Sequence, residues 1–160
     1  MRHPKLEIID ALVQSSFVVQ QILTEVGEQH DLSVIQIRLL GVLRDRQLRM
    51  APLAAILGLS KSSTTGLVDR AERRALVQRV SVPVGDERAV HVTLSDEGRR
   101  LAQQGTAEIA ERLNALAGQL SDSGRQHLAR ALTQLVYAAA DSRGLDLRAN
   151  LIKSTSVAVA

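Results

Sequence analysis

The apolar residues of positions 50–94 first recur at helical spacing and then alternate. In residues 52–57 they stand three and four positions apart, behind a proline that suits the first turn, and this predicts a short helix with one buried stripe. Gly58 and Ser60 follow as a turn residue and an N-cap. A second helix should therefore begin at Lys61.

The second helix would have one apolar and one polar face. We expect Leu67, Val68 and Ala71 to be buried on one side. The opposite side carries small hydroxyl residues at its start and arginines at its end. Small side chains can approach base edges while long basic ones reach phosphates, so this gradient is typical of a recognition helix. Its candidate DNA-binding residues are Lys61, Ser62, Ser63, Thr65, Gly66, Arg70, Arg73 and Arg74.

Two properties of this polar face bear on how it would read DNA. The hydroxyls of Ser62, Ser63 and Thr65 are expected to donate to phosphates or to base acceptors. Gly66 costs about 1 kcal/mol relative to alanine inside a helix. That cost indicates a close approach to the groove or to a neighbouring helix at this position.

Residues 76–82 and 88–94 alternate apolar and polar positions and predict an antiparallel hairpin. We expect His91 to be solvated on its polar face. Arg88, near the tip, can enter a narrow minor groove, and Asp86 would orient the guanidinium. The connecting loop would contain Pro83, Gly85 and Asp86. Two short helices followed by such a hairpin predict a winged helix-turn-helix.

Longer helical patterns flank this region. Residues 6–26 are apolar on several sides, and Gly27 is a plausible stop. Ser33 and Gln36 form a capping box that opens another helix. Ser95 caps a long helix after the hairpin.

A break around residues 118–124 precedes a last helix that Gly144 would end. The first helix and the last two carry more apolar surface than a small winged-helix core can absorb. A symmetric dimer would bury that surface and would present two recognition helices to a pseudo-palindrome. A larger monomeric helical bundle is the structural alternative.

Five segments together resemble, in order and spacing, the MarR family of transcriptional regulators. They are LGLSKSS at 57–63, LVDR at 67–70, ALVQR at 75–79, DER at 86–88 and LSDEG at 94–98. The resemblance covers about residues 6–143. It implies a dimer whose second short helix reads the major groove and whose Arg88 reaches the minor groove. The chain departs from the family pattern at Gly66, where many members carry a larger polar or basic residue, and at Ala75, which replaces a common glycine.

The resemblance also implies the organisation of the chain and its regulation. We expect one domain over 1–160, with a DNA-binding lobe at 33–94, dimerisation helices at 5–27 and 95–144, and an ambiguous tail at 145–160. Family members commonly bind small, often aromatic or anionic, molecules between these parts. A small-molecule effector is therefore expected, and Arg38, Arg44 and His30 are conceivable linings. From the resemblance we therefore expect a ligand-responsive repressor, although the residues themselves do not distinguish repression from activation.

The composition limits which partners and which kinds of regulation are expected for this chain. A chain of 160 residues is most economically one domain. Its formal net charge is only +3, but arginines gather at 70, 73, 74, 79 and 88. Phe17 and Tyr137 are its aromatic residues, which leaves no stacking platform for single strands and favours duplex DNA. The absence of cysteine excludes a thiol redox switch.

Other function classes find little support. No apolar run approaches the roughly 20 residues that span a bilayer, and no signal peptide is visible, so we expect a cytoplasmic protein. The four histidines lack metal-ligand spacing, and there is no nucleophile elbow or phosphate loop. We therefore expect no enzyme, cofactor or metal. The remaining alternative is a winged helix that binds protein instead of DNA.

Overall fold

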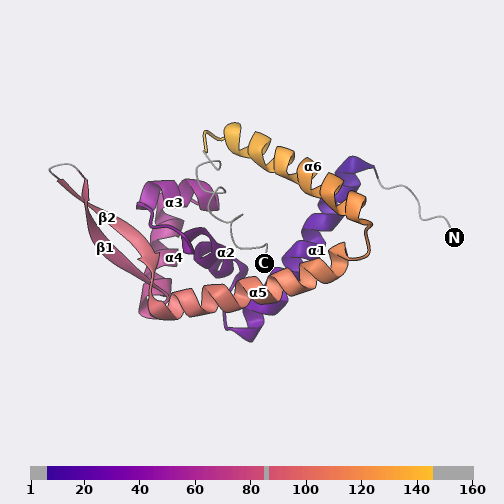
Figure 1. Ribbon diagram of the computed structural model, residues 1–160. Coiled ribbons are helices and arrows are strands. Elements are labelled where there is room, and N and C mark those ends of the chain that lie inside the picture. The colour runs from indigo at the N-terminus through magenta and orange to yellow at the C-terminus, as the bar shows by residue number, and fades with distance from the viewer. Residues whose placement is uncertain (1–6, 85–86, 146–160) are drawn as a thin grey trace. The chain divides into compact units, whose positions relative to one another are not determined.

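The computed structural model describes residues 7–84 and 87–145 (Figure 1). The chain divides into two compact units, residues 1–114 and residues 115–160. The described elements are α1 (Ile8–Gln29), α2 (Val34–Leu43), α3 (Met50–Leu57), α4 (Lys61–Arg73), β1 (Val77–Val84), β2 (Glu87–Leu94), α5 (Asp96–Ala117) and α6 (Asp122–Asp141). This order confirms the predicted fold class, a mainly helical chain with one hairpin. Whether 1–160 acts as a single domain stays a prediction.

The helix-turn-helix is formed by α3 and α4, as the sequence predicted. Helix α3 begins at Met50, two residues before the expected start, and ends at Leu57, and its C-cap Gly58 has a left-handed φ of 68°. The Ser60 hydroxyl accepts from the backbone N–H of Ser63 at 3.1 Å, so it caps α4. Helix α4 then begins at Lys61, where the pattern placed it.

A single core holds this unit together. Its buried residues come from α2, α3, α4, both strands and the start of α5. Among the fully buried side chains are Leu39, Leu43, Leu53, Leu67, Val68, Leu76, Val92 and Leu94. Burying an aliphatic side chain of this kind contributes about 1.5–3 kcal/mol. The inner face of α4 is therefore fixed by packing, and its polar face is left outside.

Gly27 does not end the first helix, contrary to the sequence prediction. Helix α1 continues to Gln29, and His30 is its C-cap. A Cβ at Gly27 would lie 2.3 Å from the carbonyl oxygen of Leu32, which is far inside contact distance. Glycine is needed here because the chain folds back onto the helix, and the Leu32 N–H donates to the Gly27 carbonyl at 2.8 Å. The capping box of Ser33 and Gln36 is confirmed at the start of α2.

The hairpin is longer than the alternation predicted. Val77 pairs with Leu94 and Pro83 pairs with Arg88, so Pro83 belongs to β1 and not to the loop. Proline is tolerated there because β1 is an edge strand of a two-stranded sheet. The tip, including Gly85 and Asp86, lies outside the described residues.

Helix α5 begins after its expected cap, whereas α6 begins inside the segment that was predicted to be a break. The Ser95 hydroxyl accepts from the Gly98 N–H at 2.9 Å, and Ser121 caps α6 in the same way. Gly124 lies inside the first turn of α6 and does not belong to the break. Helix α6 ends at Asp141, and Gly144 follows with a left-handed φ of 65°. Apart from Leu145, the tail lies outside the described residues.

Ala75 closes α4 in a conformation that usually requires glycine. Its φ is 54°, and the following Leu76 N–H donates to the Ala71 carbonyl at 2.9 Å. This is the hydrogen-bond pattern of a left-handed C-terminal cap. An alanine Cβ in this region costs about 1–2 kcal/mol.

We therefore expect Ala75→Gly to raise the free energy of unfolding by about 1 kcal/mol, because glycine relieves this strain. The matched control is Ala107→Gly at an exposed position within α5, where the same substitution should lower stability by about 1 kcal/mol. Urea unfolding of both variants measures the two changes. A loss of stability in both would show that Ala75 is not strained.

Candidate nucleic-acid interface

The polar face of α4 is exposed as the sequence predicted. Thr64, Leu67, Val68 and Ala71 are buried on its inner side. Gly66 is half-buried. The exposed members of the predicted set are Lys61, Ser62, Ser63, Thr65, Arg70, Arg73 and Arg74. Helix α4 and its C-cap Arg74 thus bring eight of the nine predicted contact residues together.

The hydroxyls at the start of α4 differ in what they can offer. Ser60 donates to the Ser63 oxygen at 2.9 Å, which leaves the Ser63 hydroxyl hydrogen free to donate. The Thr65 hydroxyl donates to the Lys61 carbonyl at 3.0 Å. Without DNA, this hydrogen bond occupies the Thr65 hydrogen that was expected to donate outward. Thr65 presents acceptor lone pairs and a methyl group, which suit a base amino group or the thymine methyl.

Gly66 leaves room for a neighbouring arginine and does not approach another helix. A Cβ there would meet only Nη1 of Arg70, at 3.3 Å. Gly66 and Arg70 line a shallow groove on the outer face of α4 together with Asp69, Glu72 and Arg73. The glycine therefore shapes the exposed surface on which a partner would lie.

Arg79 is not part of the basic surface, although the sequence grouped it with the other arginines. Its guanidinium donates to Asp69 at 2.6 Å and to Glu72, and its backbone N–H donates to Glu72 at 3.3 Å. The hydrogen bond to Asp69 is the main cause that raises the pKa of Arg79. Two carboxylates of α4 thus neutralise this residue of β1 and tie the hairpin to the helix.

The spacing of these residues carried a signal that the sequence interpretation missed. Asp69 and Glu72 are three positions apart, so they share one face of α4. Arg79 comes after the turn that follows α4 and lies near the start of β1. An acidic pair on an otherwise basic helix indicates an internal partner for a nearby arginine.

Arg74 also differs from its neighbour Arg73. Its Nη1 donates to the backbone carbonyl of Asp31, in the connection between α1 and α2. The sequence offers no pattern for this contact, because the two positions are 43 apart along the chain. Arg74 is exposed, but part of its donor capacity is used inside the protein.

The described part of the hairpin contributes Arg88, which is exposed. Its predicted partner Asp86 lies outside the described residues, so that pairing stays a prediction. His91 is not solvated as expected. Both of its ring nitrogens are shielded from solvent and have no hydrogen-bond partner among the described residues.

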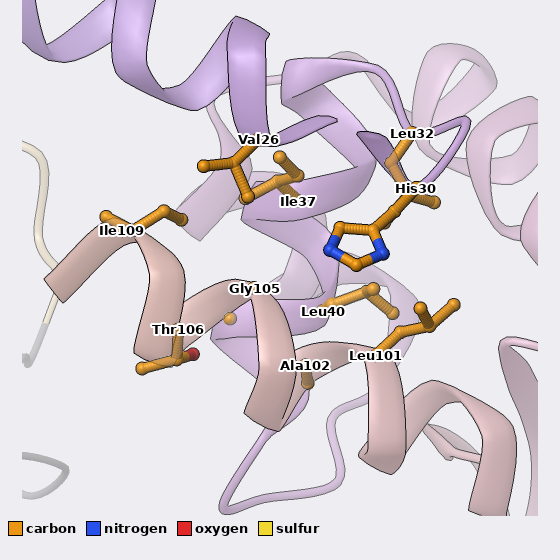
Figure 2. A pocket seen from close by; sticks show the side chains of 11 residues that line it. Val26, His30, Leu32, Ile37, Leu40, Leu101, Ala102, Gly105, Thr106 and Ile109 are labelled. Carbon is orange, nitrogen blue, oxygen red and sulfur yellow. The ribbon is translucent and has the colours of Figure 1, made fainter. Parts of the chain in front are cut away.

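A second feature lies within the first unit, a cavity between the end of α1, α2 and the first half of α5 (Figure 2). Its volume is about 90 Å³. The lining is mainly aliphatic and comprises Val26, His30, Leu32, Ile37, Leu40, Gly41, Leu101, Ala102, Gly105, Thr106 and Ile109. Its apolar lining with few polar groups resembles that of small-molecule sites, but its volume is well below the roughly 300 Å³ at which such pockets begin.

Two polar contacts involve residues that line the cavity. The His30 Nε2 lies 3.1 Å from a carboxylate oxygen of Glu108, and the ring borders the cavity (Figure 2). The Arg44 guanidinium donates to the Thr106 hydroxyl at 3.5 Å. Of the three residues proposed from the sequence, His30 lines the cavity and Arg44 contacts a lining residue. Arg38 is exposed and is not part of the lining.

The fold and the polar face of α4 are those of a winged helix-turn-helix with an exposed second helix. The MarR family model matches residues 30–89. The matched segment contains the helix-turn-helix and part of the hairpin. None of its described helices is long and apolar enough to cross a membrane.

Several known proteins are similar to this chain over most of its length. The homoprotocatechuate degradative operon repressor of Escherichia coli is 27% identical over 146 residues, which cover 91% of this chain and 96% of the relative. The structure of NadR in complex with 4-hydroxyphenylacetate has a TM-score of 0.68 and 25% identity, and covers 84% of this chain and 96% of NadR. The MepR–DNA complex of Staphylococcus aureus has the same fold, with a TM-score of 0.68, 23% identity and coverage of 84% and 99%.

The bonds of Arg79 predict a measurable role in stability. Arg79→Gln should lower the free energy of unfolding by about 1 kcal/mol and speed amide exchange in β1, because α4 then holds the hairpin less firmly. Arg100→Gln is the control, since Arg100 pairs with Glu97 within one exposed turn of α5. Urea unfolding should show little change in this control. Equal destabilisation of the two variants would contradict a special role for Arg79.

Proposed function

We propose that this protein is a homodimeric, ligand-responsive repressor that binds a pseudo-palindromic operator in duplex DNA. The single observation that carries the proposal is the exposed face of α4, with hydroxyls at its start and arginines at its end. MepR of the same fold has been solved with DNA. The protein would act in the cytoplasm, where its operator lies.

On DNA, the residues at the start of α4 would contact bases and the long arginine side chains would contact phosphates. Lys61, Ser62 and Ser63 stand in the first turn of α4, with Thr65 and the cleared surface at Gly66 beyond them, and all lie close enough to the major groove to meet base edges. Arg70 and Arg73 would reach the flanking phosphates. Arg88 on the hairpin would enter the minor groove and read its width. Asp86 would orient Arg88 before DNA arrives.

The dimer would be formed by the exposed apolar surfaces of the outer helices. In α1, Ile8, Ile9 and Phe17 are 70%, 69% and 60% exposed. In α6, Leu128, Leu132, Leu135 and Val136 are also exposed. Apolar surface of this extent in single helices is typical of an interface between subunits. A two-fold dimer would place two recognition helices on successive half-sites.

The effector would be a small aromatic acid held in the cavity of the first unit. NadR was solved with 4-hydroxyphenylacetate, and the repressor from Escherichia coli is named for an operon that degrades homoprotocatechuate. The aliphatic lining suits a ring, and His30 and the Arg44–Thr106 contact suit a polar substituent. A cavity of about 90 Å³ is smaller than the roughly 150 Å³ that accommodates benzene in an engineered cavity. An aromatic effector must therefore widen the site.

A protein-binding winged helix is the weaker alternative. Such a module has no need for exposed arginines on α4 and on the hairpin, both of which this chain keeps. The deciding experiment selects bound sequences from a random duplex library with the purified full-length protein. Enrichment of an inverted repeat supports the proposal. Failure to enrich any motif at low salt would refute it. The enriched duplex then serves to test release by 4-hydroxyphenylacetate, with its uncharged amide as control.

The division among the arginines predicts different salt dependences. Arg73→Ala should weaken all sequences similarly and flatten log affinity against log salt by roughly one unit for each phosphate that the dimer no longer neutralises. Arg79→Ala should leave that slope unchanged, because Asp69 and Glu72 already neutralise its guanidinium. Fluorescence anisotropy over a salt series measures both slopes. A flattened slope for Arg79→Ala alone would reverse the assignment.

The dimer proposal predicts the effect of one charge on α1. Phe17→Glu should shift the protein to monomers or weaken the dimer at least tenfold, since a buried, unpaired carboxylate costs several kcal/mol. Gln14→Glu at an exposed polar position of α1 adds the same charge and should leave the dimer intact. Sedimentation equilibrium distinguishes the two. A Phe17→Glu dimer as stable as the parent would remove α1 from the interface.

A further inference from the structure

The C-terminal ends of α1 and α4 are built alike and are joined by one side chain. At α1, Asp31 has a φ of 54°, and the next N–H, of Leu32, returns to Gly27. At α4, Ala75 has the same φ and is preceded by the C-cap Arg74. The Arg74 Nη1 donates to the Asp31 carbonyl. A residue at the end of the recognition helix thus holds the residue that closes α1.

The connection after α1 is rigid, so a displacement at one of its residues moves the others. Leu32 is buried, and its N–H is bonded to Gly27 at 2.8 Å. Any Cβ at Gly27 would collide with the Leu32 carbonyl, which shows how closely the chain folds back. Asp31 lies between His30 and Leu32, both of which line the cavity (Figure 2). Its carbonyl cannot keep its place if both neighbours shift.

His30 links the cavity to the connection between α1 and α2. Its ring borders the cavity, and its Nε2 lies 3.1 and 3.2 Å from the two carboxylate oxygens of Glu108 on α5. An occupant that widens the space between α5 and the end of α1 acts on His30 directly. Asp31 is the next residue, and its carbonyl is the acceptor for Arg74.

We propose that Arg74 is a positioning residue that couples occupancy of the cavity to the recognition helix through the carbonyl of Asp31. The inference rests on the proposed function and adds its route of regulation. In the DNA-binding state the Arg74–Asp31 bond fixes the end of α4. A filled cavity displaces Asp31, the bond breaks, and the population shifts to states in which α4 is held less firmly. Arg74 therefore acts inside the protein, whereas Arg73 acts on DNA.

A single hydrogen bond to an exposed guanidinium sets the size of the effect. Such bonds contribute modestly to stability, and residues that link two sites change their coupling by a limited amount. We expect a change of about three- to tenfold in operator affinity to depend on Arg74.

A cavity-filling variant tests the route without an effector. Gly105 lines the cavity, and a Cβ there meets only the Val26 side chain, at 3.9 Å. Gly105→Leu should occupy the space that an effector would take, whereas Gly105→Ala leaves most of it open and is the matched control. Gly105→Leu should weaken operator binding about three- to tenfold. In an Arg74→Ala background it should have no further effect, while in an Arg73→Ala background its effect should persist.

Amide hydrogen exchange supplies a measurement that does not need DNA. Gly105→Leu should speed exchange at the end of α4, around residues 71–76, only when Arg74 is present. If Gly105→Leu does not fold, His30→Ala, which releases the connection from Glu108, replaces it in the same cycle. Equal effects of the cavity variant with Arg74 present and in the Arg74→Ala background would overturn the proposal by either readout. A protein that binds no duplex would refute the proposed function alone, since the exchange data would still decide the coupling.

Discussion

Burial of the inner face of α4 is the constraint on which the other features depend. Leu67, Val68 and Ala71 are at most 2% exposed within a core of leucines and valines. Each contributes on the order of 1 kcal/mol or more by leaving water, so rotating the helix by even one position would expose apolar surface and bury charge. The hydroxyls and arginines on the opposite side face outward because no other orientation is stable. The same core contains residues of both strands, and it therefore also sets the base from which the hairpin projects.

Helix ends, more than helix bodies, determine how this unit is assembled. Two of them adopt a left-handed residue that is not glycine, Asp31 after α1 and Ala75 after α4. Such residues persist only where surrounding contacts enforce them. Here the enforcement comes from hydrogen bonds that fold the chain back, and from close packing such as that of Gly98, whose Cβ would lie 1.8 Å from the Leu76 carbonyl. The stiff ends can transmit a displacement, which a frayed end would absorb.

The arginines of this basic chain have different roles because their neighbours differ. Arg79 is held by Asp69 and Glu72 and joins the hairpin to the helix. Arg74 holds a backbone carbonyl of another element. Arg70 and Arg73 border the open groove on α4 and are the ones best placed for phosphates. Net charge alone would assign all of them to DNA, although two of the four stabilise the protein that presents the others.

The sequence by itself determined the local structure and the class of the protein. Helical spacing, the Ser33, Ser60 and Ser95 caps, and strand alternation are local, so they specified the helix-turn-helix, the hairpin and the outer face of α4. Errors arose where distant groups meet. The sequence predicted that Gly27 ends the first helix, but the structure shows that glycine is needed there because the Leu32 carbonyl lies against it. It also predicted a solvated His91, but the ring nitrogens of His91 are shielded from solvent. The partner of Arg74 and the cavity at His30 were likewise decided by the tertiary structure, because they depend on distances between atoms that sequence spacing does not fix.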